Sequence, residues 1–196
     1  MEVALGLKAR TGRAVIVVVG GSARDPRYVE RSEFRLLPDG ALAPYHAAAE
    51  LEPSAARSSV ERSIAAADRL AVTGLRDAVN RLIAAGHAVR RCGVLVGTGM
   101  PDWSTQQILA VHVRMHQAEG ELFRNVLVEG ARANELSVVT LPEKSALFES
   151  AKAIDATEAQ LAARLALLGK AAGPPWGKDQ KEAAAAALVA LAGIQA

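Results

Sequence analysis

The start of the chain constrains the fold most, because three strand-like segments follow one another there with no room for a helix between them. The segments are residues 3–7, 13–19 and 28–37, and residues 14–19 consist only of alanine, isoleucine and valine. Turns rich in glycine separate the segments, and Pro38-Asp39-Gly40 ends the third. Connections this short predict neighbouring antiparallel strands, which together form a meander.

The remainder of the chain alternates helices with strands. Apolar spacing and capping patterns predict helices over residues 58–86, 105–133 and 178–192, and after Thr140 and Asp155. Two further strands, 89–96 and 136–141, lie between helices, which favours parallel pairing with right-handed crossovers. The sequence therefore predicts one α/β domain over residues 1–196. Its mixed five-stranded sheet has three antiparallel strands followed by parallel strands, with helices on both faces.

Composition excludes several classes of function. Cys92 is the only cysteine, so the sequence has neither an internal disulfide nor a thiolate metal cage. Aromatic residues make up only 4% of the chain, which argues against a stacking platform for single-stranded nucleic acid. The longest apolar run, residues 183–194, is too short and too rich in alanine to span a bilayer. We therefore expect a cytoplasmic protein without a membrane partner.

Two short motifs resemble those of a known family. Gly6-Leu7 followed by Thr11-Gly12 is similar to the family's first strand, and Asp179 and Glu182 keep the spacing of two acids at the start of its last helix. With the order of elements, these motifs make the chain resemble the Holliday-junction resolvase branch of the ribonuclease H-like superfamily. The resemblance implies a ribonuclease H-like fold, a nucleic-acid partner, a homodimer, and a nuclease site whose carboxylates hold Mg²⁺ or Mn²⁺.

Two of the carboxylates that the resemblance implies are absent. Lys8 stands where the first strand of the family has an aspartate, and Gly97 stands where the fourth strand has a glutamate. Two-metal cleavage needs several carboxylates around cations that lie about 3.5–4 Å apart. Asp179 and Glu182 remain as candidate catalytic residues, and they also fit an ordinary helix start that is stabilised by the helix dipole.

Basic residues at the end of the first strand offer a different interaction. Lys8, Arg10 and Arg13 are a candidate site for a phosphate or another anionic group. A strand-end lysine exposed to solvent is the alternative interpretation of Lys8.

A second group of candidate residues lies on the helix predicted over residues 105–133. His112, His116 and Glu119 recur at positions i, i+4 and i+7, so they share one face of that helix. Such a set can hold one divalent metal, with Glu119 as a catalytic acid or base, or can form a histidine–glutamate hydrogen bond without metal. Asp102, in the loop after the fourth strand, is a further candidate metal ligand.

These patterns leave three functions open. The first is a divergent ribonuclease H-like protein that acts on or binds nucleic acid, with an altered or lost two-metal nuclease site, and whether it is an enzyme stays open. The second is a non-catalytic binding or assembly module on the same fold. The third is a phosphate-handling enzyme related to the actin-like ATPases, although that fold uses two such domains and 196 residues leave room for one.

Overall fold

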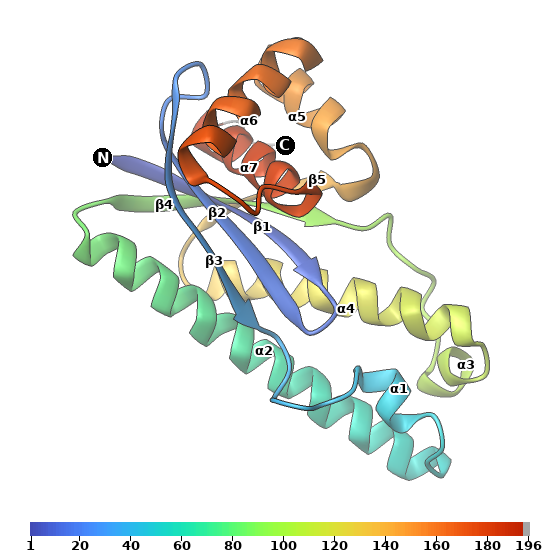
Figure 1. Ribbon diagram of the computed structural model, residues 1–196. Coiled ribbons are helices and arrows are strands. Elements are labelled where there is room, and N and C mark those ends of the chain that lie inside the picture. Colours follow the sequence, from blue (N-terminus) through green and yellow to red (C-terminus); the bar gives the residue numbers. More distant parts are fainter. Residues whose placement is uncertain (194–196) are drawn as a thin grey trace.

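The computed structural model describes residues 1–193 and arranges them around one sheet (Figure 1). Within these residues the strands are β1 (Glu2–Arg10), β2 (Arg13–Gly21), β3 (Pro26–Arg35), β4 (Ala88–Val96) and β5 (Ser137–Pro142). The helices are α1 (Pro44–Ala48), α2 (Pro53–Ala84), α3 (Thr105–Leu109), α4 (His112–Ala133), α5 (Ala146–Ala153), α6 (Glu158–Ala172) and α7 (Lys178–Leu191). A short 3₁₀ turn, η1 (Glu143–Ser145), follows β5.

The strands lie in the order β3-β2-β1-β4-β5. The first three are antiparallel neighbours, whereas β4 runs parallel to β1 and β5 runs parallel to β4. The turn between β1 and β2 contains Gly12 with a φ of +71°, a left-handed conformation that suits glycine. The predicted mixed five-stranded sheet is thus confirmed within residues 1–193, including the pairing of residues 13–19 with residues 28–37.

Helices cover both faces of the sheet, as the sequence predicted (Figure 1). Successive residues of a strand point to opposite faces. Leu5 and Leu7 of β1 therefore pack with α2 and α4, whereas Ala4 packs with α5, α6 and α7. Lys8 follows this alternation and lies on the face that α7 covers. In the part of the chain that the structure describes, no helix is both long and apolar enough to cross a membrane.

Helix α7 lies close to the sheet because two glycines face it. A Cβ atom at Gly6 of β1 would lie 1.7 Å from the carbonyl oxygen of Ala183, and one at Gly93 of β4 would lie 2.2 Å from that of Ala186. The helix presents fully buried alanines to this surface, so backbone packs almost directly on backbone. The contact fixes the first turns of α7 against the end of β1.

The prediction of a single helix over residues 105–133 is wrong. The chain forms two helices there, α3 and α4, and breaks at Val111, which has an extended backbone with φ −139° and ψ 112°. The predicted capping box is present at the start of α3, where the side chains and backbone amides of Ser104 and Gln107 bond reciprocally. The candidate histidines and Glu119 therefore belong to the first turns of a new helix, α4.

Three other helix starts also differ from the prediction. Helix α2 begins at Pro53 instead of near Ser58. The amide hydrogen of a first helical residue has no partner within the helix, so proline, which lacks this hydrogen, is favoured at that position. The helix expected at Asp155 begins later, where Thr157 caps α6. The helix expected after Thr140 is also delayed, because β5 continues past this residue and α5 starts only after η1.

Candidate functional site

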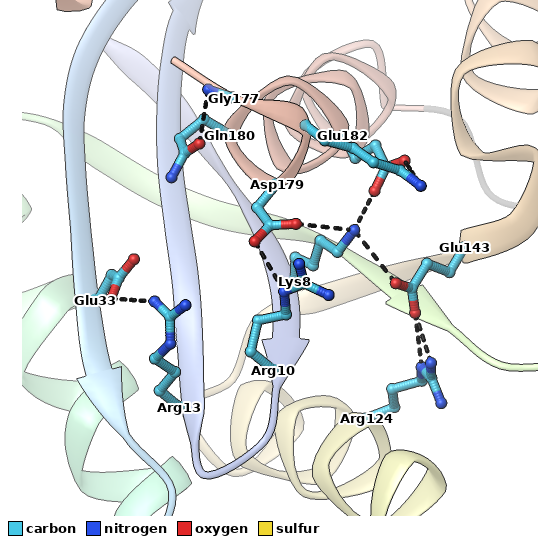
Figure 2. A network of polar contacts seen from close by, with 11 residues as sticks. Lys8, Arg10, Arg13, Glu33, Arg124, Glu143, Gly177, Asp179, Gln180 and Glu182 are labelled. Carbon is cyan, nitrogen blue, oxygen red and sulfur yellow. Dashed lines mark hydrogen bonds and ion pairs between the residues drawn. The ribbon is translucent and has the colours of Figure 1, made fainter. Parts of the chain in front are cut away.

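A buried lysine lies near the end of β1. Lys8 is 1% exposed, and its ammonium group lies among three carboxylates (Figure 2). Its Nζ is 3.2 Å from Oε1 of Glu143, 3.2 Å from Oδ1 of Asp179, and in hydrogen-bond contact with Oε2 of Glu182. The ammonium group thus donates a hydrogen bond to Glu182 and forms ion pairs with Glu143 and Asp179. We call these four residues the carboxylate cage.

Segments far apart in the sequence build the carboxylate cage. Strands β1, β4 and β5 are parallel, so their carboxyl ends lie at one edge of the sheet, and Glu143 directly follows β5 at that edge. Asp179 and Glu182 are three residues apart in the first turns of α7 and project from one face of it. Gly177 is the N-cap residue of α7, and its backbone N–H donates a hydrogen bond to Oε1 of Gln180 over 3.0 Å.

Two arginines bind the outer oxygens of the carboxylate cage. The Nε of Arg10 lies 2.8 Å from Oδ2 of Asp179. Arg124 donates to Oε2 of Glu143 from both Nε, at 3.0 Å, and Nη2, at 2.6 Å. Together with Lys8, these arginines supply three positive charges to a cage of three carboxylates. The cluster is therefore balanced in charge by the protein itself.

Burial and ion pairing act in opposite directions on the pKa values of the cage. Burial alone lowers the pKa of Lys8, but hydrogen bonds and charge from the carboxylates, first of all Glu182, raise it above its ordinary value. Burial alone raises the pKa values of Glu143 and Asp179, but the neighbouring guanidinium and ammonium groups lower both below their ordinary values. These three groups are therefore charged at neutral pH.

The cage does not fit a pair of divalent metal ions. Its centre holds the ammonium group of Lys8, and protein cations already bind the carboxylates. A Cβ atom at Gly97, where the resemblance implied a further glutamate, would lie 2.5 Å from Oε2 of Glu121 and 3.2 Å from Nη1 of Arg124. The ammonium group of Lys8 thus stands where the resemblance implied an aspartate, and Glu121, itself a carboxylate, lies with Arg124 beside the position where it implied a glutamate.

A solvent-open cleft lies beside the carboxylate cage. It consists of two adjoining cavities of 440 and 490 Å³. Arg10 and Arg13, whose side chains are about half exposed, line the first cavity, and Lys144 and Lys178 line the second. The residues that line both cavities are His116, Gly120, Arg124 and Glu143. We call the two cavities together the basic cleft.

Three histidines gather where α1 meets the start of α4. His46 comes from α1, and His112 and His116 come from the first turns of α4. The Nε2 atoms of His112 and His116 are 3.0 Å apart. One ring nitrogen from each of the three histidines lies within 4.8 Å of the other two. His116 also lines the basic cleft, so the cluster borders that cleft.

A buried carboxylate supports this histidine cluster. Glu119 is 4% exposed, and its Oε1 accepts hydrogen bonds from the backbone N–H groups of Tyr45, at 3.0 Å, and His46, at 3.1 Å. Nδ1 of His46 lies 2.9 Å from both oxygens of the carboxylate. Glu119 thus binds the free amides at the start of α1 and fixes the ring of His46.

The predicted site residues fall into separate groups. Asp179 and Glu182 meet around Lys8, whose ammonium group faces inward. Of the three residues of the predicted anion site, only Arg10 and Arg13 line the basic cleft. His112 and His116 contact each other. Glu119 hydrogen-bonds to His46, whose ring lies beside those of His112 and His116. Asp102 lines a different cavity, of 490 Å³, and joins neither group among the described residues.

Sequence reasoning missed three residues of these groups. Glu143 had a signal, since an acid directly after a strand that is parallel to its neighbours lies at the edge where ligands bind such sheets. No sequence pattern marked Arg124 as a functional residue, apart from its position in α4. His46 lies on the short helix α1, and no periodicity links it to the histidines of α4.

Comparison with known proteins agrees with the fold. No protein-family model and no curated protein sequence matches the chain. RuvC from Thermus thermophilus in complex with a Holliday junction substrate superimposes with a TM-score of 0.50 and 12% sequence identity, over 95% of this chain and 91% of RuvC. A second structure of Thermus thermophilus RuvC gives a TM-score of 0.49 and 13% identity, over 95% of this chain and 92% of RuvC. The first of these two structures confirms the predicted ribonuclease H-like fold.

Proposed function

We propose that the protein binds nucleic acid in the basic cleft and does not cut it by the two-metal mechanism. The observation that carries this proposal is the ammonium group of Lys8, which lies within 3.2 Å of carboxylates from both Glu143 and Asp179. The chain keeps the fold of a resolvase, but its own lysine supplies the positive charge that metal ions bring to such carboxylates. The homodimer that the resemblance implies stays a prediction.

Electrostatic repulsion is the physical reason for expecting no two-metal cleavage. A divalent ion 4 Å from an ammonium group is repelled by about 8 kcal/mol at an effective dielectric constant of about 20. Displacing that ammonium group is costly as well, because Lys8 is buried and its displacement would leave the carboxylates without their partner. The lysine therefore competes with metal ions for the same oxygens from inside the protein.

The charge and shape of the basic cleft support nucleic acid as the partner. Its charged lining residues are five basic ones, Arg10, Arg13, Arg124, Lys144 and Lys178, and three acidic ones, Glu119, Glu121 and Glu143. The side chain of Lys178 is 80% exposed. Exposed basic side chains along a cleft attract phosphate groups without reading the base sequence. A solved structure with the same fold, RuvC, holds a Holliday junction substrate. We therefore expect branched or duplex DNA to bind through its backbone.

Fluorescence anisotropy with labelled four-way junction and duplex DNA tests the proposal. The Arg13→Gln variant should weaken binding and reduce the slope of log affinity against log salt by about 1, because one phosphate contact is lost. Arg81→Gln is the matched control: both arginines are about half exposed and pair with a glutamate of β3, but Arg81 does not line the basic cleft.

Two results would overturn the proposal. Absence of salt-dependent binding to both DNA forms would exclude nucleic acid as the partner and favour a module with another ligand. Magnesium-dependent cutting of the junction by the wild-type protein, abolished by Asp179→Asn, would show that the cage takes up metal despite Lys8.

A further inference from the structure

We propose that His46, His112 and His116 form a site for one transition-metal dication, with Zn²⁺ as the reference ion and a coordination position open to the basic cleft. The site is distinct from the carboxylate cage. It involves imidazole ligands where the resemblance implied carboxylates. It does not depend on the proposed nucleic-acid function, because it rests on the positions of three side chains and their support.

The positions of the ring nitrogens suit a single ion. Three nitrogens that each bond zinc at about 2.0–2.1 Å in a tetrahedral arrangement lie about 3.3 Å from one another. The Nε2 atoms of His112 and His116 are 3.0 Å apart, and all three ligand nitrogens lie within 4.8 Å of one another. His112 and His116 are exposed, so their rings can close on an ion by small rotations of the side chains.

The Nε2 atoms of His112 and His116 lie 3.0 Å apart, a distance at which the two nitrogens either share one hydrogen as N–H···N or bind a common cation. A metal ion satisfies both nitrogens at once, and it also accounts for the approach of a third ring, whose centroid lies 4.7 Å from that of His116 and 5.3 Å from that of His112.

Glu119 prepares His46 to act as a ligand. A carboxylate only accepts hydrogen bonds, so Nδ1 of His46 donates to Glu119 over 2.9 Å, and Nε2 of the neutral ring keeps its lone pair. Metal-binding histidines usually donate their second ring nitrogen to a carboxylate in this way, which fixes the tautomer and the orientation of the ring. Glu119 itself is buried and held by backbone amides, so this support is rigid.

The ligand set selects the class of metal. Imidazole nitrogens favour zinc, copper, nickel and cobalt, whereas magnesium, calcium and manganese prefer oxygen ligands. Three protein ligands leave the fourth position of a tetrahedral zinc ion to water or to another oxygen donor. Because His116 lines the basic cleft together with Arg10 and Arg13, that position is open to a phosphate oxygen in the cleft.

Isothermal titration of the untagged, metal-free protein with Zn²⁺ alone tests the site. The wild-type protein should bind one Zn²⁺ per chain, and Co²⁺ should bind at the same stoichiometry and give visible ligand-field absorption. His112→Gln and His116→Gln should each weaken Zn²⁺ binding at least tenfold. Both side chains are exposed, so these variants should keep the circular dichroism spectrum and melting temperature of the wild-type protein without metal.

The fourth histidine of the chain provides the matched control. His87 lies before β4, outside the cluster, and His87→Gln should bind Zn²⁺ as the wild-type protein does. Glu119→Gln should weaken binding about 10- to 100-fold, as is typical for the loss of a carboxylate that supports a ligand. The proposal is overturned if the wild-type protein binds no Zn²⁺, if the variants of His112 and His116 bind it unchanged, or if His87→Gln loses binding equally.

Discussion

The Nζ atom of Lys8 lies 3.2 Å from Oδ1 of Asp179, although the two residues come from opposite ends of the chain. This ion pair connects the first strand of the sheet with the first turn of the last described helix. It joins two positions that the resemblance to a resolvase assigned to metal ligands. One of these positions holds a carboxylate and the other a cation, so a side chain of the protein supplies positive charge to the acids.

Replacing Lys8 should destabilise the protein strongly. Lys8→Met removes the positive charge at the centre of the carboxylate cage and leaves Glu143, Asp179 and Glu182 close to one another without it. Breaking a buried ion pair in this way costs about 3–5 kcal/mol, which urea denaturation at pH 7 measures. Lys178→Met is the control, because that side chain is 80% exposed, and its effect should stay within about 0.5 kcal/mol. Equal losses in the two variants would contradict the cage.

The stability of the wild-type protein should fall in acid. The pKa values of Asp179 and Glu143 are lowered from the ordinary 3.8 and 4.5, so their stabilising contribution is present above these values and is lost as the pH falls through their lowered values. The pKa of Lys8 is raised from the ordinary 10.5, so its contribution is present below that value and is lost as the pH rises through its raised value. The cage thus contributes a plateau of stability between about pH 5 and pH 10.

The pH dependence should change sign in acid when Lys8 is replaced. In Lys8→Met the crowded carboxylates repel one another, and their pKa values rise instead of falling. Protonation then relieves the repulsion, so this variant should gain stability as the pH falls from 7 toward 5, while the wild-type protein should not. Denaturation curves of both proteins across this range measure the difference. Parallel profiles would show that the carboxylates do not depend on Lys8.

Close packing of α7 on the sheet should make Gly6 intolerant of a side chain. Gly6→Ala places a Cβ atom 1.7 Å from the carbonyl oxygen of Ala183, so the backbone of α7 must move. We expect a loss of at least about 3 kcal/mol of unfolding free energy, at the upper end of the usual cost of overpacking. Gly20→Ala on β2 is the control, because its nearest contact is the flexible Met1 side chain, 2.8 Å away. A similar small loss in both variants would contradict the close approach.

The meander and the acids of α7 could be predicted because their signals are local. Residues 1–37 contain apolar runs and turn residues in direct succession, and Asp179 and Glu182 lie within one turn of a helix. The burial of Lys8 could not be predicted in the same way, since its partners come from η1 and α7 and meet it only when the sheet and helix have assembled. A lysine near a strand end carries no local sign of such partners.

The break between α3 and α4 was missed for a related reason. The apolar spacing continues from Ile108 through the break to Met115, so periodicity indicates one helix. Contacts of a single side chain bridge the break: Arg114 donates to the carbonyl oxygen of Gln107 over 3.0 Å, and its guanidinium group lies 4.7 Å from the ring centroid of Trp103. Interactions of this kind depend on geometry that the spacing of residues does not encode.

Changing Lys8 to an acid should give the cage an affinity for magnesium that we do not expect of the wild-type protein. Lys8→Asp replaces the central cation by a fourth carboxylate beside Glu143, Asp179 and Glu182, and oxygen ligands of this kind bind Mg²⁺. Without metal the variant should melt below the wild-type protein, because its carboxylates repel one another. Millimolar Mg²⁺ should raise its melting temperature, since an ion that binds only the folded state stabilises that state. The increase should be smaller in Lys8→Met, which has one carboxylate fewer, and absent in the wild-type protein.

Differential scanning calorimetry of the three proteins, with and without Mg²⁺, measures the order of these increases in melting temperature. An increase in the wild-type protein as large as that in Lys8→Asp would mean that the ammonium group does not exclude the metal.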